Sequence, residues 1–168
     1  LGKRPVKQDN LIPRLWVLPA TIHARVGKEP GPQRAMLEEG HLLVILHEMP
    51  GPEETKRRAA LFWRAPDGVW KSNQQGKGLA SLFDHVEAYE KRLGELEAQG
   101  DRADTAQAYR EILANAAPLL RSSRGMHRAL QQAREMVKED RDLINLRDQA
   151  AGVERAAELL LHDAEFGL

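Results

Sequence analysis

The sequence predicts an α+β fold, in which a small, mostly antiparallel sheet is followed by long helices that form a hairpin or stalk. The main observation is a change of texture near residue 76 in a chain of 168 residues. Before this point prolines and glycines separate short apolar segments, whereas after it a single proline remains and Ala, Leu, Glu, Gln and Arg dominate. We therefore expect a β-rich region over residues 1–76 and a helical region over residues 77–168, packed together as one domain.

Composition excludes several classes of protein. Lys and Arg number 25 and so do Asp and Glu, and this zero formal charge argues against a general nucleic-acid binder. The absence of cysteine excludes disulfides, thiolate catalysis and cysteine-based zinc sites. The longest apolar run, residues 42–46, is far shorter than the roughly 20 residues that cross a bilayer.

Four segments of the first region have the composition of strands, at residues 15–26, 41–48, 59–64 and 69–72. The second segment is almost continuously apolar, which is typical of a strand buried on both faces. Between the last two segments stands Asp67-Gly68. This pair predicts a tight hairpin, because such turns need positive φ angles.

Apolar residues of the second region recur at alternating spacings of three and four, which predicts helices with one buried seam each. The seams run over residues 79–96, 109–137 and 143–164. Pro118 should kink or divide the second helix. We expect a break at Lys138-Glu139-Asp140, with the acidic residues favoured at the start of the third helix.

The third seam is rich in alanine, which permits close approach of helices. It consists of Leu143, Leu146, Ala150, Val153, Ala157 and Leu160. We expect the first helix to cover the sheet and the other two to form a long hairpin that projects from the sheet or packs beside it. The seams fit either an intramolecular hairpin or a self-associating stalk, and the two are compatible because a helix has more than one face.

Motifs that carry chemistry are few. Gly76-Lys77-Gly78 precedes a helix and could hold an anion there, but it lacks the remainder of a phosphate-loop pattern and fits a plain loop-to-helix junction better. His23, His41 and His47 could in principle bind a metal from one face of the sheet. His41 and His47, however, are six residues apart, roughly 20 Å along a strand, so these two cannot share a metal. No catalytic motif is present, so the sequence does not indicate an enzyme.

One group of residues near the end of the chain could hold a divalent cation. Glu158 and His162 are four residues apart, on one face of the predicted helix, and Asp163 follows directly. Between residues 135 and 168 there are nine acidic residues against four basic ones, and hard cations such as Mg²⁺ prefer oxygen ligands. An ordinary solvated helix face has the same appearance and is the commoner explanation.

Two stretches of this helical region resemble a known family. Residues 139–148 (EDRDLINLRD) and 154–163 (ERAAELLLHD) are similar to the stalk-helix region of bacterial CorA-type divalent-cation transporters. The match covers only about the last 45 residues. The remainder of the chain resembles the family only in the order of its predicted elements, with a sheet first and long helices after it. The sheet region is short for that family, and no metal-sensing carboxylate can be carried over position by position.

The resemblance implies a pentameric transporter of Mg²⁺ or a related divalent ion. This chain would be its regulatory part at the cytoplasmic face of the membrane, with no transport activity alone. The family's Gly-Met-Asn signature and two membrane helices would lie beyond Leu168, so we expect the natural polypeptide to continue. Metal held between cytosolic domains of that family favours the closed state. The alternative is a self-associating α/β scaffold or adaptor without catalytic activity, which would form homo-oligomers through its seams.

Overall fold

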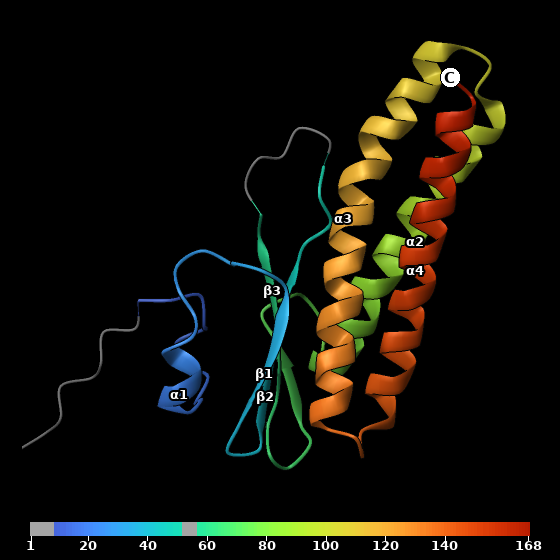
Figure 1. The fold of residues 1–168 in the computed structure, drawn as a ribbon. Coiled ribbons are helices and arrows are strands. Elements are labelled where there is room, and N and C mark those ends of the chain that lie inside the picture. The colour runs from blue at the N-terminus through green and yellow to red at the C-terminus, as the bar shows by residue number, and fades with distance from the viewer. Residues whose placement is uncertain (1–8, 52–56) are drawn as a thin grey trace, which may run out of the picture.

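The computed structural model describes residues 9–51 and 57–168 of the chain. A four-stranded antiparallel sheet stands between a short helix on one face and three long helices on the other, which confirms the α+β class (Figure 1). The elements are α1 (Ala20–His23), β1 (Arg34–Glu38), β2 (His41–His47), β3 (Ala59–Arg64), β4 (Trp70–Ser72), α2 (Gly78–Arg102), α3 (Ala106–Met136) and α4 (Arg141–Phe166).

The sheet is a simple meander in the order β1-β2-β3-β4. β2 is central and buried on both faces, as its continuous apolar run predicts. Leu42, Val44 and Leu46 face the long helices, while Leu43 and Ile45 face the α1 side. Each face of this strand therefore contributes to a separate apolar core.

The predicted hairpin between β3 and β4 is present. Gly68 has a φ of +88°, which L-residues with a side chain rarely adopt, and the N–H of Val69 donates to Asp67 Oδ1 at 3.0 Å. A second tight hairpin joins β1 to β2 through Glu39 and Gly40, which both have positive φ. The sequence analysis missed β1, because a Glu-Gly turn lacks the usual signal and only Ala35 and Met36 are buried in that strand.

The prediction of a strand over residues 15–26 is wrong. This segment contains α1 and irregular chain. Pro19 stands at the helix N-terminus, where its fixed φ suits the turn into a helix. Ile22 of α1 and Val26, in the chain after the helix, are both buried on the sheet's outer face, whereas Ala24 between them is exposed, so burial does not follow the apolar–polar alternation.

The three long helices correspond to the three predicted seams. α3 continues through Pro118 without being divided. The predicted break before α4 is present, with Asp140 as the N-cap: its Oδ1 accepts the N–H groups of Asp142 at 2.9 Å and Leu143 at 3.3 Å. The other side-chain oxygen of Asp140 binds Arg64 Nε of β3 at 2.8 Å, so the cap also joins the bundle to the sheet.

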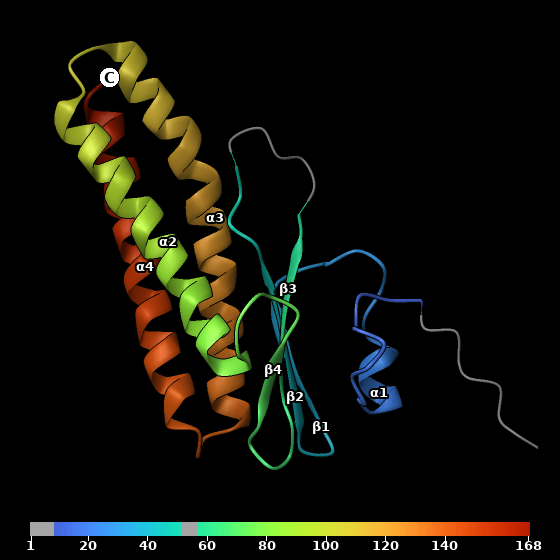
Figure 2. The same cartoon turned by 180° about the vertical axis from the view of Figure 1, so that it is seen from behind.

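Both α2 and α3 cover the sheet, which corrects the expectation that the first long helix does so alone. α3 lies on β1 and β2, whereas α2 lies on β3 and β4. A sheet of four strands spaced by about 4.8 Å is wider than one helix of about 10 Å, so one helix would leave apolar surface uncovered. α4 packs on α2 and α3, away from the sheet (Figure 2).

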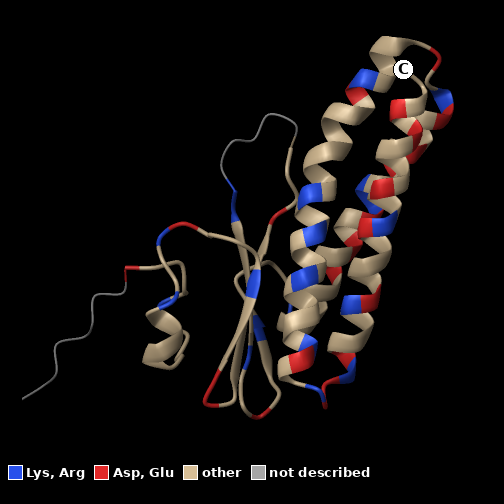
Figure 3. Cartoon of the chain, in the orientation of Figure 1, with Lys and Arg blue, Asp and Glu red and all other residues tan. Residues whose placement is uncertain are grey.

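The structure places the six residues of the third seam inside this bundle, each no more than 6% exposed. They pack against α2 and α3 of the same chain. The charged residues of the helices are mainly exposed, and Figure 3 shows how they are distributed along the three long helices.

Candidate functional site

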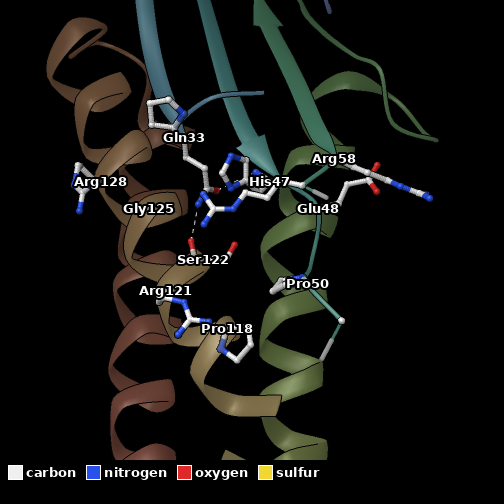
Figure 4. Close-up of a pocket in the computed structure, with 13 residues that line it drawn as sticks. Gln33, His47, Glu48, Pro50, Arg58, Pro118, Arg121, Ser122, Gly125 and Arg128 are labelled. Atoms are coloured by element: carbon white, nitrogen blue, oxygen red, sulfur yellow. Dashed lines mark hydrogen bonds between the residues drawn. The ribbon is translucent and has the colours of Figure 1, made fainter. Parts of the chain in front are cut away.

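A cleft of about 380 Å³ opens where the end of β2 and the start of β3 approach the middle of α3 (Figure 4). Its lining includes His47, Glu48 and Ser122, three prolines, and a set of arginines from two separate segments. The arginines are Arg57, Arg58, Arg121 and Arg128. The cleft is therefore strongly basic although the chain as a whole has no net charge.

A buried glutamine joins the sheet to α3 at the base of this cleft. Gln33 Nε2 donates to the carbonyl oxygen of Ser122 at 2.8 Å, and its Oε1 accepts the N–H of His47 at 3.0 Å. A Cβ on Gly125 would overlap the amide of Gln33, so a larger residue at this turn of α3 would displace that amide from its present position. The absence of a side chain at one position thus permits a direct sheet-to-helix hydrogen bond.

A tyrosine from α2 completes the framework. Tyr89 OH donates to the carbonyl oxygen of His47 at 2.9 Å, so Ser122 Oγ, at 2.6 Å, donates to the same phenol oxygen. Burial raises the pKa of Tyr89 to about 12, so the phenol remains protonated at neutral pH. One side chain therefore connects α2, β2 and α3 beside the cleft.

His47 is held in a single tautomer. Its Nε2 lies 2.7 Å from the carbonyl oxygen of Gly31, an obligate acceptor, so Nε2 carries the proton in the neutral ring. Burial lowers the pKa of His47; the hydrogen bond to Gly31 opposes this shift, and the charges of Arg57 and Arg34 add to it. The imidazole is consequently neutral near pH 7 and adds no charge to the cleft.

The arginines of the cleft have no acidic partners in residues 9–51 and 57–168: none of the four takes part in an ion pair there. Among the described residues of the lining, Glu48 is the one that is acidic. Figure 4 shows Glu48 and Arg58 extending together on one side of His47, with Arg121 and Arg128 of α3 on the other side. This leaves the α3 side of the cleft purely basic.

The residues predicted to hold a metal are not all brought together. Glu158 and His162 line one shallow surface concavity, while Asp163 lines another with Glu97 and Asp101. Glu158 lies 3.5 Å from a guanidinium nitrogen of Arg124, and the ring of His162 packs edge-on against Phe166. In the described part of the chain no three His, Asp or Glu residues are placed to hold a metal ion. The three residues, all on the surface of α4, remain a prediction as metal ligands.

The histidines of the first region do not gather either. His23 Nδ1 lies 3.0 Å from Asn10 Nδ2, whereas His41 Nδ1 accepts a hydrogen bond from Trp63 Nε1 at 3.1 Å. Both are on the α1 side of the sheet or at its end, away from the cleft that His47 lines. Their contacts are those of structural histidines.

The glycine at the start of α2, Gly78, has a packing role. A Cβ on Gly78 would overlap the carbonyl group of Trp70, so the first residue of α2 lies directly against the backbone of β4. This close approach accounts for the glycine that follows Lys77 and favours the plain loop-to-helix junction.

The basic cleft was not predicted from the sequence, although two signals for it are present there. Arg57-Arg58 immediately precedes a strand, and Arg121 and Arg128 are seven residues apart, on one face of a helix. Neither signal shows by itself that the two segments meet.

Comparison with known proteins identifies no family: no protein-family model matches the chain, and no curated protein matches it in sequence. Among the helices of the described ranges, none combines the length and apolar character that a membrane span requires.

Proposed function

We propose that this chain is the regulatory domain, at the cytoplasmic face of the membrane, of a CorA-like transporter of Mg²⁺ or a related divalent ion. One observation carries the proposal: the two stretches similar to the stalk helix of that family, 139–148 and 154–163, lie on one element, α4 with its N-cap, apart from Glu139 in the turn just before the cap. α4 follows a sheet and two antiparallel helices, in the order that the resemblance implies.

Regulation would depend on metal held between neighbouring subunits. Glu158, His162 and Asp163 are exposed on α4, and together with the other described residues of one chain they do not form a complete ligand set. A second subunit would have to supply the remaining ligands. A metal bound in this way stabilises one arrangement of the subunits over another, and this difference in stability regulates the transport path.

The sequence downstream of Leu168 tests the proposal directly. We expect two apolar stretches of roughly 20 residues, the first ending in Gly-Met-Asn. The full-length protein should then restore growth at low Mg²⁺ to cells that lack their own Mg²⁺ transporters. A stop codon soon after Leu168, or a full-length protein that neither forms a pentamer nor carries divalent ions, would overturn the proposal.

The metal-sensing step needs a separate test on the full-length protein. Mg²⁺ should slow limited proteolysis of the wild-type assembly, and the double change Glu158→Gln with His162→Ala should reduce this protection. Glu90→Gln, at an exposed position on α2, is a matched control that should retain the full effect. Equal protection in all three proteins would remove these residues from the metal site.

The alternative function, a self-associating scaffold or adaptor, has one observation in its favour. Leu159 and Phe166 are 56% and 79% exposed, and their separation of seven residues places them on one face of α4. Light scattering on the isolated chain would distinguish the two functions. A tight homo-oligomer that is insensitive to divalent ions favours the scaffold, whereas the transporter domain should associate weakly without its membrane helices.

A further inference from the structure

We propose that the basic cleft between β2, β3 and α3 binds a soluble anion that carries more than one phosphate group. The site is independent of the proposed transport function and lies on a different part of the molecule from the α4 residues discussed above. It is built from residues far apart in the sequence, with Arg57 before β3 and Arg121 and Arg128 on α3.

Charge is the first argument. The described residues bring several guanidinium groups to one concave surface without pairing them with carboxylates, which costs electrostatic free energy that a bound anion would offset. Arg57 lies close enough to His47 to lower the pKa of that imidazole. Glu48, beside Arg58, leaves the α3 side unneutralised (Figure 4). Figure 3 also shows basic residues grouped along the middle of α3.

Guanidinium groups are well suited to binding phosphate. Arginine presents planar, bidentate donors that match the oxygens of phosphate, and its charge persists at any physiological pH. Arg121 and Arg128 are two helical turns apart, about 10 Å along the axis of α3. A ligand that engages both, together with Arg57, is more extended than a single phosphate ion.

The shape of the cleft limits the rest of the ligand. Its volume of about 380 Å³ is at the small end of the range for ligand sites. Among the described residues no Phe, Tyr or Trp lines it, and the one aromatic ring there, the imidazole of His47, is hydrogen-bonded to the carbonyl oxygen of Gly31. The neighbouring polar groups of Gln33 and Tyr89 are engaged in hydrogen bonds within the protein. Recognition therefore falls to the arginines, which favours an oligophosphate.

The framework beneath the arginines is rigid enough to preorganise such a site. Gln33 fixes β2 to α3, and Tyr89 fixes both to α2. The prolines at positions 32, 50 and 118 restrict the backbone around the opening. A preorganised frame reduces the entropy lost when the ligand binds.

Isothermal titration of the chain with pyrophosphate and with inorganic phosphate, at low ionic strength and without divalent metal, tests the proposal. We expect pyrophosphate to bind at least tenfold more tightly than phosphate. The double change Arg121→Gln with Arg128→Gln should weaken pyrophosphate binding at least tenfold. Because both side chains are exposed, circular dichroism and the melting temperature should remain as in the wild type.

The matched control changes the same number of charges elsewhere. Arg102→Gln with Arg110→Gln alters two exposed arginines that do not line the cleft, and this variant should bind pyrophosphate as the wild type does. Equal weakening in both double variants would show non-specific attraction and overturn the proposal. Absence of pyrophosphate binding by the wild type at millimolar concentration, or equal affinity for the two anions, would also overturn it.

A phosphate group can also belong to a lipid. Co-sedimentation with phosphatidylcholine vesicles containing phosphatidic acid separates the two sources. Pyrophosphate binding without vesicle binding supports the soluble ligand. Vesicle binding that is lost in Arg121→Gln with Arg128→Gln, without binding of pyrophosphate, would overturn the soluble ligand in favour of a headgroup.

Discussion

At the scale of single residues, glycine positions determine how closely the elements approach one another. Gly78 begins α2 directly against the Trp70 carbonyl, and Gly125 lets Gln33 reach α3. Gly94, by contrast, is exposed within α2 and has open space around its Cα. Glycines in helices of the same chain therefore have opposite consequences when they are replaced.

We predict that Gly78→Ala lowers the free energy of unfolding by about 1–3 kcal/mol, because the new Cβ can be accommodated only by moving backbone. Gly94→Ala should raise the same quantity by about 0.5–1 kcal/mol, because alanine loses less backbone entropy in a helix and meets no neighbour. Urea denaturation of both variants measures the difference. If Gly78→Ala is as stable as Gly94→Ala, α2 does not lie against β4 as described.

Such contacts could not be predicted from the sequence. Gly76-Lys77-Gly78 indicates a loop and the start of a helix. Glycine is required at position 78, however, because the carbonyl group of Trp70 lies against it, and this contact exists only after the β3–β4 hairpin has folded. Likewise, the hydrogen bond between Gln33 and Ser122 spans 89 residues. Local propensity carries no information about a partner so distant in the chain.

At the scale of elements, whether a helix or strand could be predicted correctly depended on the length of its periodic pattern. The long seams after residue 76 predicted all three long helices, since many repeats of the same spacing leave little ambiguity. The segment at 15–26 is short, and there alternation of apolar and polar residues was mistaken for a strand. The basic cleft was missed for a different reason, because it requires knowledge of which helix covers which strands.

The seam of α4 supports a prediction about a single element. Val153 is 2% exposed between α4 and its neighbours, whereas Leu159, on the same helix, is 56% exposed. Val153→Asp should lower the free energy of unfolding by about 3 kcal/mol or more, because it buries an unpaired charge. Leu159→Asp should change the same quantity by no more than about 0.5 kcal/mol.

Chemical denaturation measures both effects, and light scattering on the same samples measures mass. A Val153→Asp variant with unchanged stability would contradict the interior position of this seam. If the Leu159→Asp variant keeps its stability but has a lower mass in solution than the wild type, the exposed face of α4 is the surface of self-association.

At the scale of the whole molecule, the sheet and the bundle are joined by apolar packing and by a few polar contacts. The pair between Arg64 and Asp140 is one of these, with side chains 16% and 8% exposed and a sequence separation of 76. Removal of either partner would leave a largely buried charge unpaired, which is costly. The same carboxylate caps α4, so the orientation of this helix, which packs mainly on α2 and α3, is linked to the sheet.

A histidine at this interface should make the stability of the whole fold depend on pH. His85 of α2 packs its ring on Phe62 of β3 and on Tyr89, and its Nε2 is buried without a hydrogen-bond partner among the described residues. Burial, with a smaller effect of the nearby His47, lowers the pKa of His85 to about 4 from the 6.5 of an unperturbed imidazole. The folded protein therefore holds this ring neutral at pH values where the unfolded chain already protonates it.

Because the unfolded state binds more protons between these two pKa values, the free energy of unfolding should fall as the pH decreases from 6.5 towards 4. His85→Phe keeps a ring of similar size and removes the titrating group, so we expect a shallower slope in this interval. His162→Phe, at an exposed position on α4, should retain the wild-type slope. Urea denaturation at a series of pH values measures the slope for the wild type and the two variants.

Carboxylates that titrate in the same interval contribute equally to each protein, so the difference in slope between the two variants reports on His85 at the sheet–bundle interface. Identical slopes in the two variants would mean that the ring of His85 is not sealed between the sheet and the bundle.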